Sequence, residues 1–239
     1  MTELLYQTNA YIQEFDASVI AVLPEQHAVV LDRTAFYPGG GGQPCDFGSL
    51  LIAGVTYPVN KVKKNGEAVL HFVAVNEPLP PVSSASHGTL DWARRYKLMR
   101  THTALHVLCG TVFRDYGAHV TGGDMEPLKG RMDFEFETMR GELVREIEAA
   151  VNKEAAQARQ IRVRILPRDE AFQIPDLIRT KINLLPEGIT QIRTVEIVGL
   201  DLQADGGTHV HNTIEIGHIR VVDYKSKGAI NKRLYIEVE

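Results

Sequence analysis

The chain has 239 residues, of which 44% are hydrophobic and 23% charged, a composition typical of a globular protein with a substantial core. No apolar run approaches the roughly 18 residues needed to cross a bilayer, and the N-terminus lacks the basic-then-apolar order of a signal peptide. The net charge of −4 argues against broad, non-specific binding of nucleic acid, and two cysteines are too few for a disulfide framework. We therefore expect a protein of the reducing cytoplasm that does not associate with membranes.

Residues 1–75 are expected to form mainly β-strands. Short apolar runs alternate with turn residues throughout this stretch, and no long helical period is visible. The residues that follow, 76–88, are rich in proline and serine, as is typical of a linker. We therefore predict a small β-barrel-like subdomain over 1–86 and a second domain over 87–239.

Residues 37–44, which read YPGGGGQP, depart from this strand pattern. Four consecutive glycines, Gly39, Gly40, Gly41 and Gly42, fit neither a helix nor a strand, because glycine loses the most conformational freedom in either. Such a run exposes backbone N–H groups or lets another chain approach closely, although a plain flexible loop is the simpler explanation from these residues alone. No GK[ST] follows, so the run is not a phosphate-binding P-loop and we expect no nucleotide cofactor.

Residues 93–116 are predicted to form a helix that carries His102 and His106. Histidines four residues apart lie on one face of a helix, one turn apart, and together can bind one metal ion, most often zinc. Cys109 is on roughly the same face, but seven residues of helix advance about 10.5 Å, too far for a third ligand to the same ion. Because Thr103 follows His102, the HExxH pattern of zinc proteases is absent.

The rest of the chain favours an α+β fold. Met132, Phe134 and Phe136 alternate with acidic residues, which predicts a strand with one buried face. Apolar residues at four-residue steps predict an amphipathic helix over 141–160. We expect helices packed on an antiparallel sheet. Further strands are predicted over 161–167, 194–200, 208–217, 218–228 and 233–239.

A second histidine-bearing run, DGGTH at 205–209, supplies what the helical pair lacks. Three segments together resemble the alanyl-tRNA editing proteins of the medium-length type, free-standing relatives of the editing domain of alanyl-tRNA synthetase. They are similar as well to the editing domain of threonyl-tRNA synthetase. The segments are LDRTAFYPGGGGQPCDFG (31–48), RRYKLMRTHTALHVL (94–108) and LQADGGTHVHNTIEIG (202–217). The family usually has CGGTH in the last segment, and here the cysteine position is Asp205.

The resemblance implies an aminoacyl-tRNA deacylase that acts in trans on mischarged tRNA-Ala. Its substrate would be seryl-tRNA-Ala, with glycyl-tRNA-Ala as a second candidate. One zinc ion would be held by His102, His106 and His209, with Asp205 in the fourth position. Three roles remain open for Asp205: a direct ligand, a base that contacts a metal-bound water, and a simple turn residue before two glycines.

The resemblance also assigns residues of the N-terminal region to the editing pocket. Thr34 and Gln43 are expected to line it, and a hydroxyl at Thr34 could hydrogen-bond the serine hydroxyl that alanine lacks. The run Gly39–Gly42 would face the pocket and the tRNA end. From its residues alone, Thr34 is explained equally well as a strand-end residue that caps a turn.

A non-catalytic module that only binds tRNA is the main alternative function, and the change at Asp205 gives this alternative some weight. Local basic patches could contact a tRNA end despite the negative net charge, although solvated charged faces explain them equally well. The two candidate patches consist of Arg94, Arg95, Lys97 and Arg100, and of Lys225, Lys227, Lys232 and Arg233.

Overall fold

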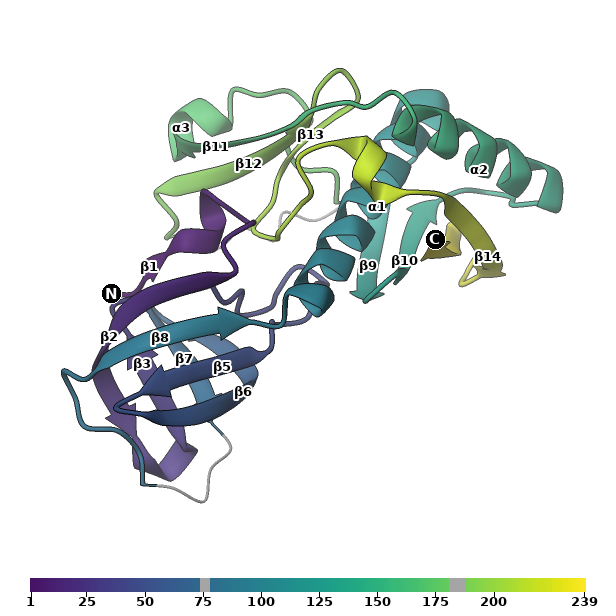
Figure 1. Ribbon diagram of the computed structural model, residues 1–239. Helices are drawn as coiled ribbons and strands as arrows, with labels where there is room; N and C mark the ends of the chain where they lie inside the picture. The colour runs from purple at the N-terminus through teal and green to yellow at the C-terminus, as the bar shows by residue number, and fades with distance from the viewer. Residues whose placement is uncertain (74–77, 181–187) are drawn as a thin grey trace. The chain divides into compact units, whose positions relative to one another are not determined.

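The computed structural model describes residues 1–73, 78–180 and 188–239 (Figure 1). The chain divides into two compact units between Tyr96 and Lys97. This division falls ten residues after the predicted boundary at residue 86 because residues 85–90 form a strand of the N-terminal unit. The linker was predicted over residues 76–88. Its first two residues lie in the stretch 74–77, which is outside the described residues.

Six antiparallel strands close the N-terminal unit into a barrel, which confirms the strand-rich, barrel-like prediction (Figure 1). Side chains alternate between the interior and the surface, as the two-residue period of a strand requires. Val29, Leu31, Leu50 and Val59 are among the fully buried side chains that fill the interior. Around the barrel the strands are β2 (Glu14–Leu23), β3 (Ala28–Leu31), β7 (Ala68–Val73), β6 (Val55–Asn65), β5 (Gly48–Ile52) and β8 (Ala85–Leu90).

A short parallel pair, β1 (Glu3–Leu4) and β4 (Arg33–Thr34), precedes the glycine-rich segment. The pair is anchored to the barrel through Thr2, whose hydroxyl donates to the carbonyl of Leu31 at 2.8 Å and accepts from the amide of Val69 at 3.3 Å. The chain therefore enters the glycine-rich segment from a fixed position.

The C-terminal unit is built on a four-stranded antiparallel sheet with a helix packed on it, as predicted. Helix α2 (Gly141–Ala155) buries Val144 and Ile147 and packs on the edge strand β14. Asn152 of this helix bonds both backbone groups of Ile219 in β14, at 2.7 and 2.9 Å. The strands lie in the order β14 (Ile219–Ser226), β15 (Asn231–Val238), β10 (Lys129–Glu135) and β9 (Val120–Glu126).

Helix α1 (Trp92–Tyr116) matches the helix predicted over 93–116 and is buried throughout its central part, from residue 101 to 112. It lies close to the sheet where the side chain of Leu105 contacts Gly130 of β10, since a Cβ at Gly130 would stand 3.0 Å from Leu105. In the part of the chain that is described, no helix combines the length and the apolar character needed to span a membrane.

A second, three-stranded sheet consists of β11 (Ile161–Pro167), β12 (Gln191–Ile197) and β13 (Asp201–Ala204), and the short helix α3 (Arg168–Ala171) follows β11. All three strands are antiparallel. The chain leaves β13 directly into the DGGTH run, so this sheet positions the run.

The strand predicted over 208–217 is wrong. This segment is a loop that ends in a 3-10 helix, η3 (Thr213–Ile216). A capping box replaces the strand: the Asn212 side chain accepts from the amide of Ile214 at 2.9 Å, and the Glu215 carboxylate accepts from the amides of His211 and Asn212. These side-chain bonds satisfy backbone groups that a strand would offer to a neighbour.

Candidate metal centre

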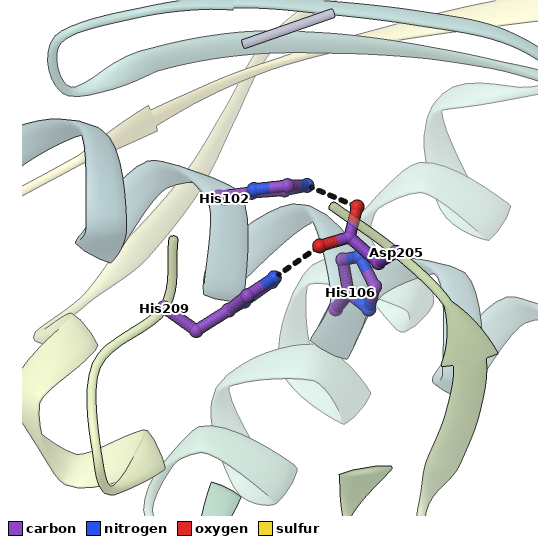
Figure 2. Close-up of side chains that lie close together, drawn as sticks. All are labelled: His102, His106, Asp205 and His209. Atoms are coloured by element: carbon purple, nitrogen blue, oxygen red, sulfur yellow. Dashed lines mark hydrogen bonds and ion pairs between the residues drawn. The ribbon is translucent and has the colours of Figure 1, made fainter. Parts of the chain in front are cut away.

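The four side chains predicted to bind a metal lie together in the C-terminal unit (Figure 2). His102 and His106 project from one face of α1, and their ring centroids are 5.0 Å apart. Asp205 and His209 come from the loop between β13 and η3. Each residue offers one ligand atom, and all four atoms lie within 4.8 Å of one another. Two runs about a hundred residues apart thus form one cluster.

The Asp205 carboxylate points between two of the imidazoles (Figure 2). Its Oδ2 is 3.0 Å from Nε2 of His209, and its Oδ1 is 3.5 Å from Nε2 of His102. The rings of His102 and His209 stack with centroids 4.2 Å apart, and all three imidazoles are buried. The potential ligand atoms therefore face one another rather than solvent.

Thr103 contacts Nδ1, the ring nitrogen of His209 that does not face Asp205. The Thr103 hydroxyl donates to the carbonyl of Met99 at 2.9 Å, as side chains of this type do within helices. Its oxygen also accepts from the amide of Val210 at 3.2 Å and lies 3.2 Å from Nδ1 of His209. A proton of His209 on Nδ1 would donate to Thr103 and leave the lone pair of Nε2 for a metal ion, whereas a proton on Nε2 would donate to Asp205.

Burial keeps two of the imidazoles neutral. It lowers the pKa of His102 well below the ordinary value, more strongly than the nearby Asp205 carboxylate raises it, and it lowers the pKa of His209 to about 4. Burial alone would raise the pKa of Asp205, but its interactions with the imidazoles of His102 and His209, the latter a hydrogen bond, hold that pKa well below the ordinary value. Neutral imidazoles beside an ionised carboxylate are the protonation states that a metal ion requires.

The pKa of His106 shifts in the opposite direction. Burial lowers it, but the carboxylates of Asp201 and Asp205 outweigh burial, so the pKa is raised overall. His106 Nδ1 lies 3.3 Å from Oδ2 of Asp201, on the side of the ring away from the cluster.

The geometry of this cluster fits a bound cation. Nε2 of His209 and Oδ2 of Asp205 are 3.0 Å apart and can share one proton in a hydrogen bond. A metal ion bound by both groups would replace that proton. Three imidazole nitrogens and one carboxylate oxygen form a donor set that zinc accepts in tetrahedral sites, so the residues present fit such an ion.

Asp205 also forms the turn that its two following glycines suggest. Its Oδ2 accepts from the amide of Gly207 at 2.7 Å, and Nη1 of Arg193 donates to its backbone carbonyl at 2.9 Å. The turn and the position beside the imidazoles are compatible, because the turn holds the carboxylate where it faces the histidines.

The glycine-rich segment forms an ordered turn in the N-terminal unit. Gly40 and Gln43 exchange two backbone hydrogen bonds, at 2.9 and 3.0 Å, and Gly41 and Gly42 between them have φ of 57° and 87°. Positive φ at both central residues defines a type I′ turn, for which glycine is favoured. The glycines are therefore required by the backbone conformation.

Asp46 and Arg95 fix the ends of this segment. Asp46 accepts from the amide of Tyr37 at 2.6 Å and donates its own amide to the carbonyl of Tyr37 at 3.0 Å. The fully buried guanidinium of Arg95 pairs with the Asp46 carboxylate and donates to the carbonyl of Ala35 at 2.6 Å. The glycine turn is thus held at its base by a buried ion pair.

Thr34 is also in the N-terminal unit and is fully buried. Its oxygen accepts from the amide of Phe36 at 3.1 Å and lies 2.8 Å from Nε2 of His71. His71 Nδ1 is 3.3 Å from the carbonyl of Val29, which places the proton of the neutral imidazole on Nδ1. The Thr34 hydroxyl then donates to Nε2, which leaves its oxygen with one further acceptor position.

Several of the basic side chains suggested for tRNA contact have partners inside the protein instead. Arg95 is buried against Asp46, and Arg100 donates to the carbonyls of Ile216 and Glu239, each at 2.6 Å. In the second patch, Lys232 donates to two backbone carbonyls and Arg233 pairs with Asp133. These four cations support the fold.

Two residues that support the cluster were not predicted. Thr103 lies between the two histidines of the helix, and the i to i−4 hydroxyl bond of threonine in helices was an available signal for it. Asp201 starts β13, outside every recognisable motif, so only the three-dimensional structure identifies it.

Comparisons with known proteins point to tRNA-linked proteins in both units. The family model for class II (A) tRNA synthetases matches residues 5–94. The model for the second additional domain of threonyl- and alanyl-tRNA synthetases matches residues 192–235, which include Asp205 and His209.

Similar proteins extend over the whole chain. The chain is 41% identical to the alanyl-tRNA editing protein AlaX-M of Saccharolobus solfataricus, over 100% of both chains. It is 36% identical to the protein of the same name from Methanosarcina acetivorans, over 98% of both chains. It is also 37% identical to the alanine–tRNA ligase of Ignicoccus hospitalis, over 92% of this chain but only 24% of the ligase.

Proposed function

The chain belongs to the alanyl-tRNA editing proteins, and from this premise we propose that it hydrolyses mischarged tRNA-Ala in trans. The substrate is seryl-tRNA-Ala, with glycyl-tRNA-Ala as a second substrate. The match to an alanine–tRNA ligase supports this proposal, because it relates the chain to a protein that joins alanine to tRNA. The reaction belongs to the cytoplasm, where charged tRNA is made and used.

The observation that carries the proposal is the cluster of His102, His106, Asp205 and His209 in a chain similar throughout to editing proteins. Three imidazole nitrogens and a carboxylate would hold one zinc ion between α1 and the loop after β13. When bound, the ion would supply Lewis-acid polarisation of a carbonyl or a water.

The reaction cleaves the ester that joins serine to the terminal ribose of the tRNA. Water adds to the acyl carbon, the bond between this carbon and the ribose oxygen breaks, and that oxygen regains a proton. The products are free serine and tRNA with its terminal hydroxyl restored. The burial of the three imidazoles supports such a site, because electrostatic interactions are stronger away from bulk water.

We further propose that Thr34 and Gln43 of the N-terminal unit contact the substrate and that Gly39–Gly42 contact the tRNA end. Supporting this role, the Thr34 oxygen keeps one free acceptor position after bonding His71 and Phe36. A serine hydroxyl could donate to that position, whereas alanine has no donor to offer. Gln43 is held beside the turn by its two backbone bonds to Gly40.

Thr34→Val should lower the hydrolysis of seryl-tRNA-Ala by about tenfold or more, the loss of one buried hydrogen bond. Thr2→Val is the matched control, because Thr2 is also buried in this unit and its hydroxyl donates to Leu31. Rates measured with both variants at equal stability separate the two roles. Equal loss in both would make Thr34 a purely structural residue.

The proposal is tested with purified protein and preformed seryl-tRNA-Ala, with released serine as the readout. We expect rapid release, loss of activity on removal of the metal by a chelator, and recovery when zinc is restored. A protein that binds the tRNA tightly but releases no serine under any metal condition is a non-catalytic binding module, the alternative function.

A further inference from the structure

The Nδ1 edge of the His106 ring, which points away from the cluster, lies beside a buried carboxylate. His106 Nδ1 is 3.3 Å from Oδ2 of Asp201, and the Asp201 side chain is 0% exposed. The contact is not aligned well enough to be a hydrogen bond, and Nδ1 has no other hydrogen-bond partner among the described residues. A buried polar nitrogen without a partner is unfavourable, and a small rotation of the ring would give it one.

Asp201 is held in place by groups other than His106. Gln203 donates to Oδ2 at 2.6 Å, and Nε of Arg179 lies 3.3 Å from Oδ1. The guanidinium of Arg179 in turn stacks on the ring of Phe113 in α1. The carboxylate therefore has a fixed position beside the helix that carries both histidines.

A glycine in α1 allows this close approach. A Cβ at Gly110 would stand 2.8 Å from Cβ of Asp201 and 3.2 Å from the carbonyl oxygen of Leu200. Glycine is otherwise unfavourable inside a helix. Its presence one turn after His106 lets the start of β13 contact the helix where the carboxylate can reach the imidazole.

We propose that Asp201 is a positioning residue for His106. By accepting the proton on Nδ1, it keeps Nε2 unprotonated and turned toward the other three ligand atoms, the arrangement that carboxylates support behind metal-binding histidines. This inference rests on the metal site of the proposed function. It assigns Asp201 no contact with the metal or the substrate.

A purely structural role is the competing explanation, since Asp201 also compensates the charge of Arg179. The two roles differ in what the loss of the carboxylate changes. A structural role lowers stability alone. A positioning role lowers metal affinity and alters the His106 tautomer even where the fold is retained.

The test compares Asp201→Ala and Asp201→Asn with wild type in zinc affinity, measured by competition with a chelator. We expect about 10–100-fold weaker binding for Asp201→Ala. Asp201→Asn should fall between, because it keeps an oxygen but loses the charge. Asp133→Ala is the control, because it removes another buried carboxylate of the same unit, the partner of Arg233. It should leave zinc affinity within about twofold.

Nitrogen-15 NMR of His106 in the metal-free protein gives a second readout that needs no activity. Wild type should show the proton on Nδ1, and Asp201→Ala should show a mixture of the two tautomers. Gly110→Ala gives a third test if Asp201→Ala does not fold. It pushes Asp201 away without changing any charge, and it too should weaken zinc binding.

The inference is overturned if wild type binds zinc while folded Asp201→Asn and Gly110→Ala both bind it equally well and keep the wild-type tautomer. Failure of the proposed metal site looks different. In that case wild type itself retains no zinc, and the inference falls with the site.

Discussion

Asp205 combines two roles in one carboxylate. It closes the turn to Gly207, and it faces the imidazoles of His102 and His209. The family resemblance leads us to expect cysteine at this position. A carboxylate is a harder ligand than a thiolate and is less selective for zinc. The chain is therefore expected to hold zinc more weakly than a protein with cysteine at this position.

Asp205→Cys and Asp205→Asn test direct ligation. Asparagine can still accept from the Gly207 amide, so the turn remains while the charge is lost. If Asp205 is a ligand, the cysteine variant should bind zinc more tightly than wild type and the asparagine variant at least about tenfold more weakly. Chelator competition measures both. Unchanged zinc affinity in Asp205→Asn with a slower reaction would instead make Asp205 a base.

The buried imidazole of His71 makes the stability of the barrel depend on pH. Burial lowers its pKa to about 4, against an ordinary value of 6.5, and the hydrogen bond to the Val29 carbonyl only partly offsets this effect. Between pH 6.5 and 4 the unfolded chain binds a proton that the folded chain does not, so stability decreases as pH falls. The full difference of the two pKa values corresponds to roughly 3 kcal/mol.

His71→Leu should remove this dependence. The variant is expected to be less stable than wild type at pH 7.5, because Thr34 loses its acceptor, but the gap should narrow toward pH 4.5. Denaturant unfolding at both pH values measures the gap. His27→Asn, which removes an exposed imidazole of the same unit, serves as the control. A gap that stays constant between the two pH values would mean that His71 is not held neutral by burial.

At the scale of elements, the β5–β6 turn serves as a matched control for the glycine turn at residues 40–43. Gly41 and Gly54 have φ of 57° and 82°, and a Cβ at either would meet nothing within 4 Å. Valine at either position should therefore lower stability by a similar amount, about 1–2 kcal/mol, through backbone strain alone.

Gly41→Val should lower tRNA deacylation beyond this shared effect, while Gly54→Val should not. Zinc content should be normal in both variants, because the candidate metal ligands lie in the other unit. Single-turnover rates at a temperature where both variants are folded make the comparison. Equal rates in the two variants would mean that the glycine-rich segment has no specific role in deacylation.

Elements with strong periodicity were predictable from the sequence. The helix that carries His102 and His106 and the strands of the barrel follow from apolar spacing. Residues 208–217 were not, because the capping box of Asn212 and Glu215 outweighs an alternation that is typical of strands. Side-chain bonds to the backbone decided the local structure there, and hydrophobic pattern does not report them.

At the scale of the whole molecule, the residues that meet in the cluster were predictable but their supports were not. A family resemblance identified His102, His106, Asp205 and His209 as one group, and the structure brings their ligand atoms within 4.8 Å of one another. The contact of Asp201 with His106 and the pairing of Arg95 with Asp46 depend on long-range packing. No motif in the surrounding sequence predicts either of these contacts.

The central claim is selective hydrolysis of mischarged tRNA-Ala, and one measurement tests it most directly. Seryl-, glycyl- and alanyl-tRNA-Ala are incubated separately with the zinc-loaded protein, and the rate of amino-acid release is compared. We predict that serine is released at least about a hundredfold faster than alanine, since a site built to bond a hydroxyl discriminates strongly against a substrate that lacks one. Equal rates for serine and alanine, or no release of serine at all, would contradict the account.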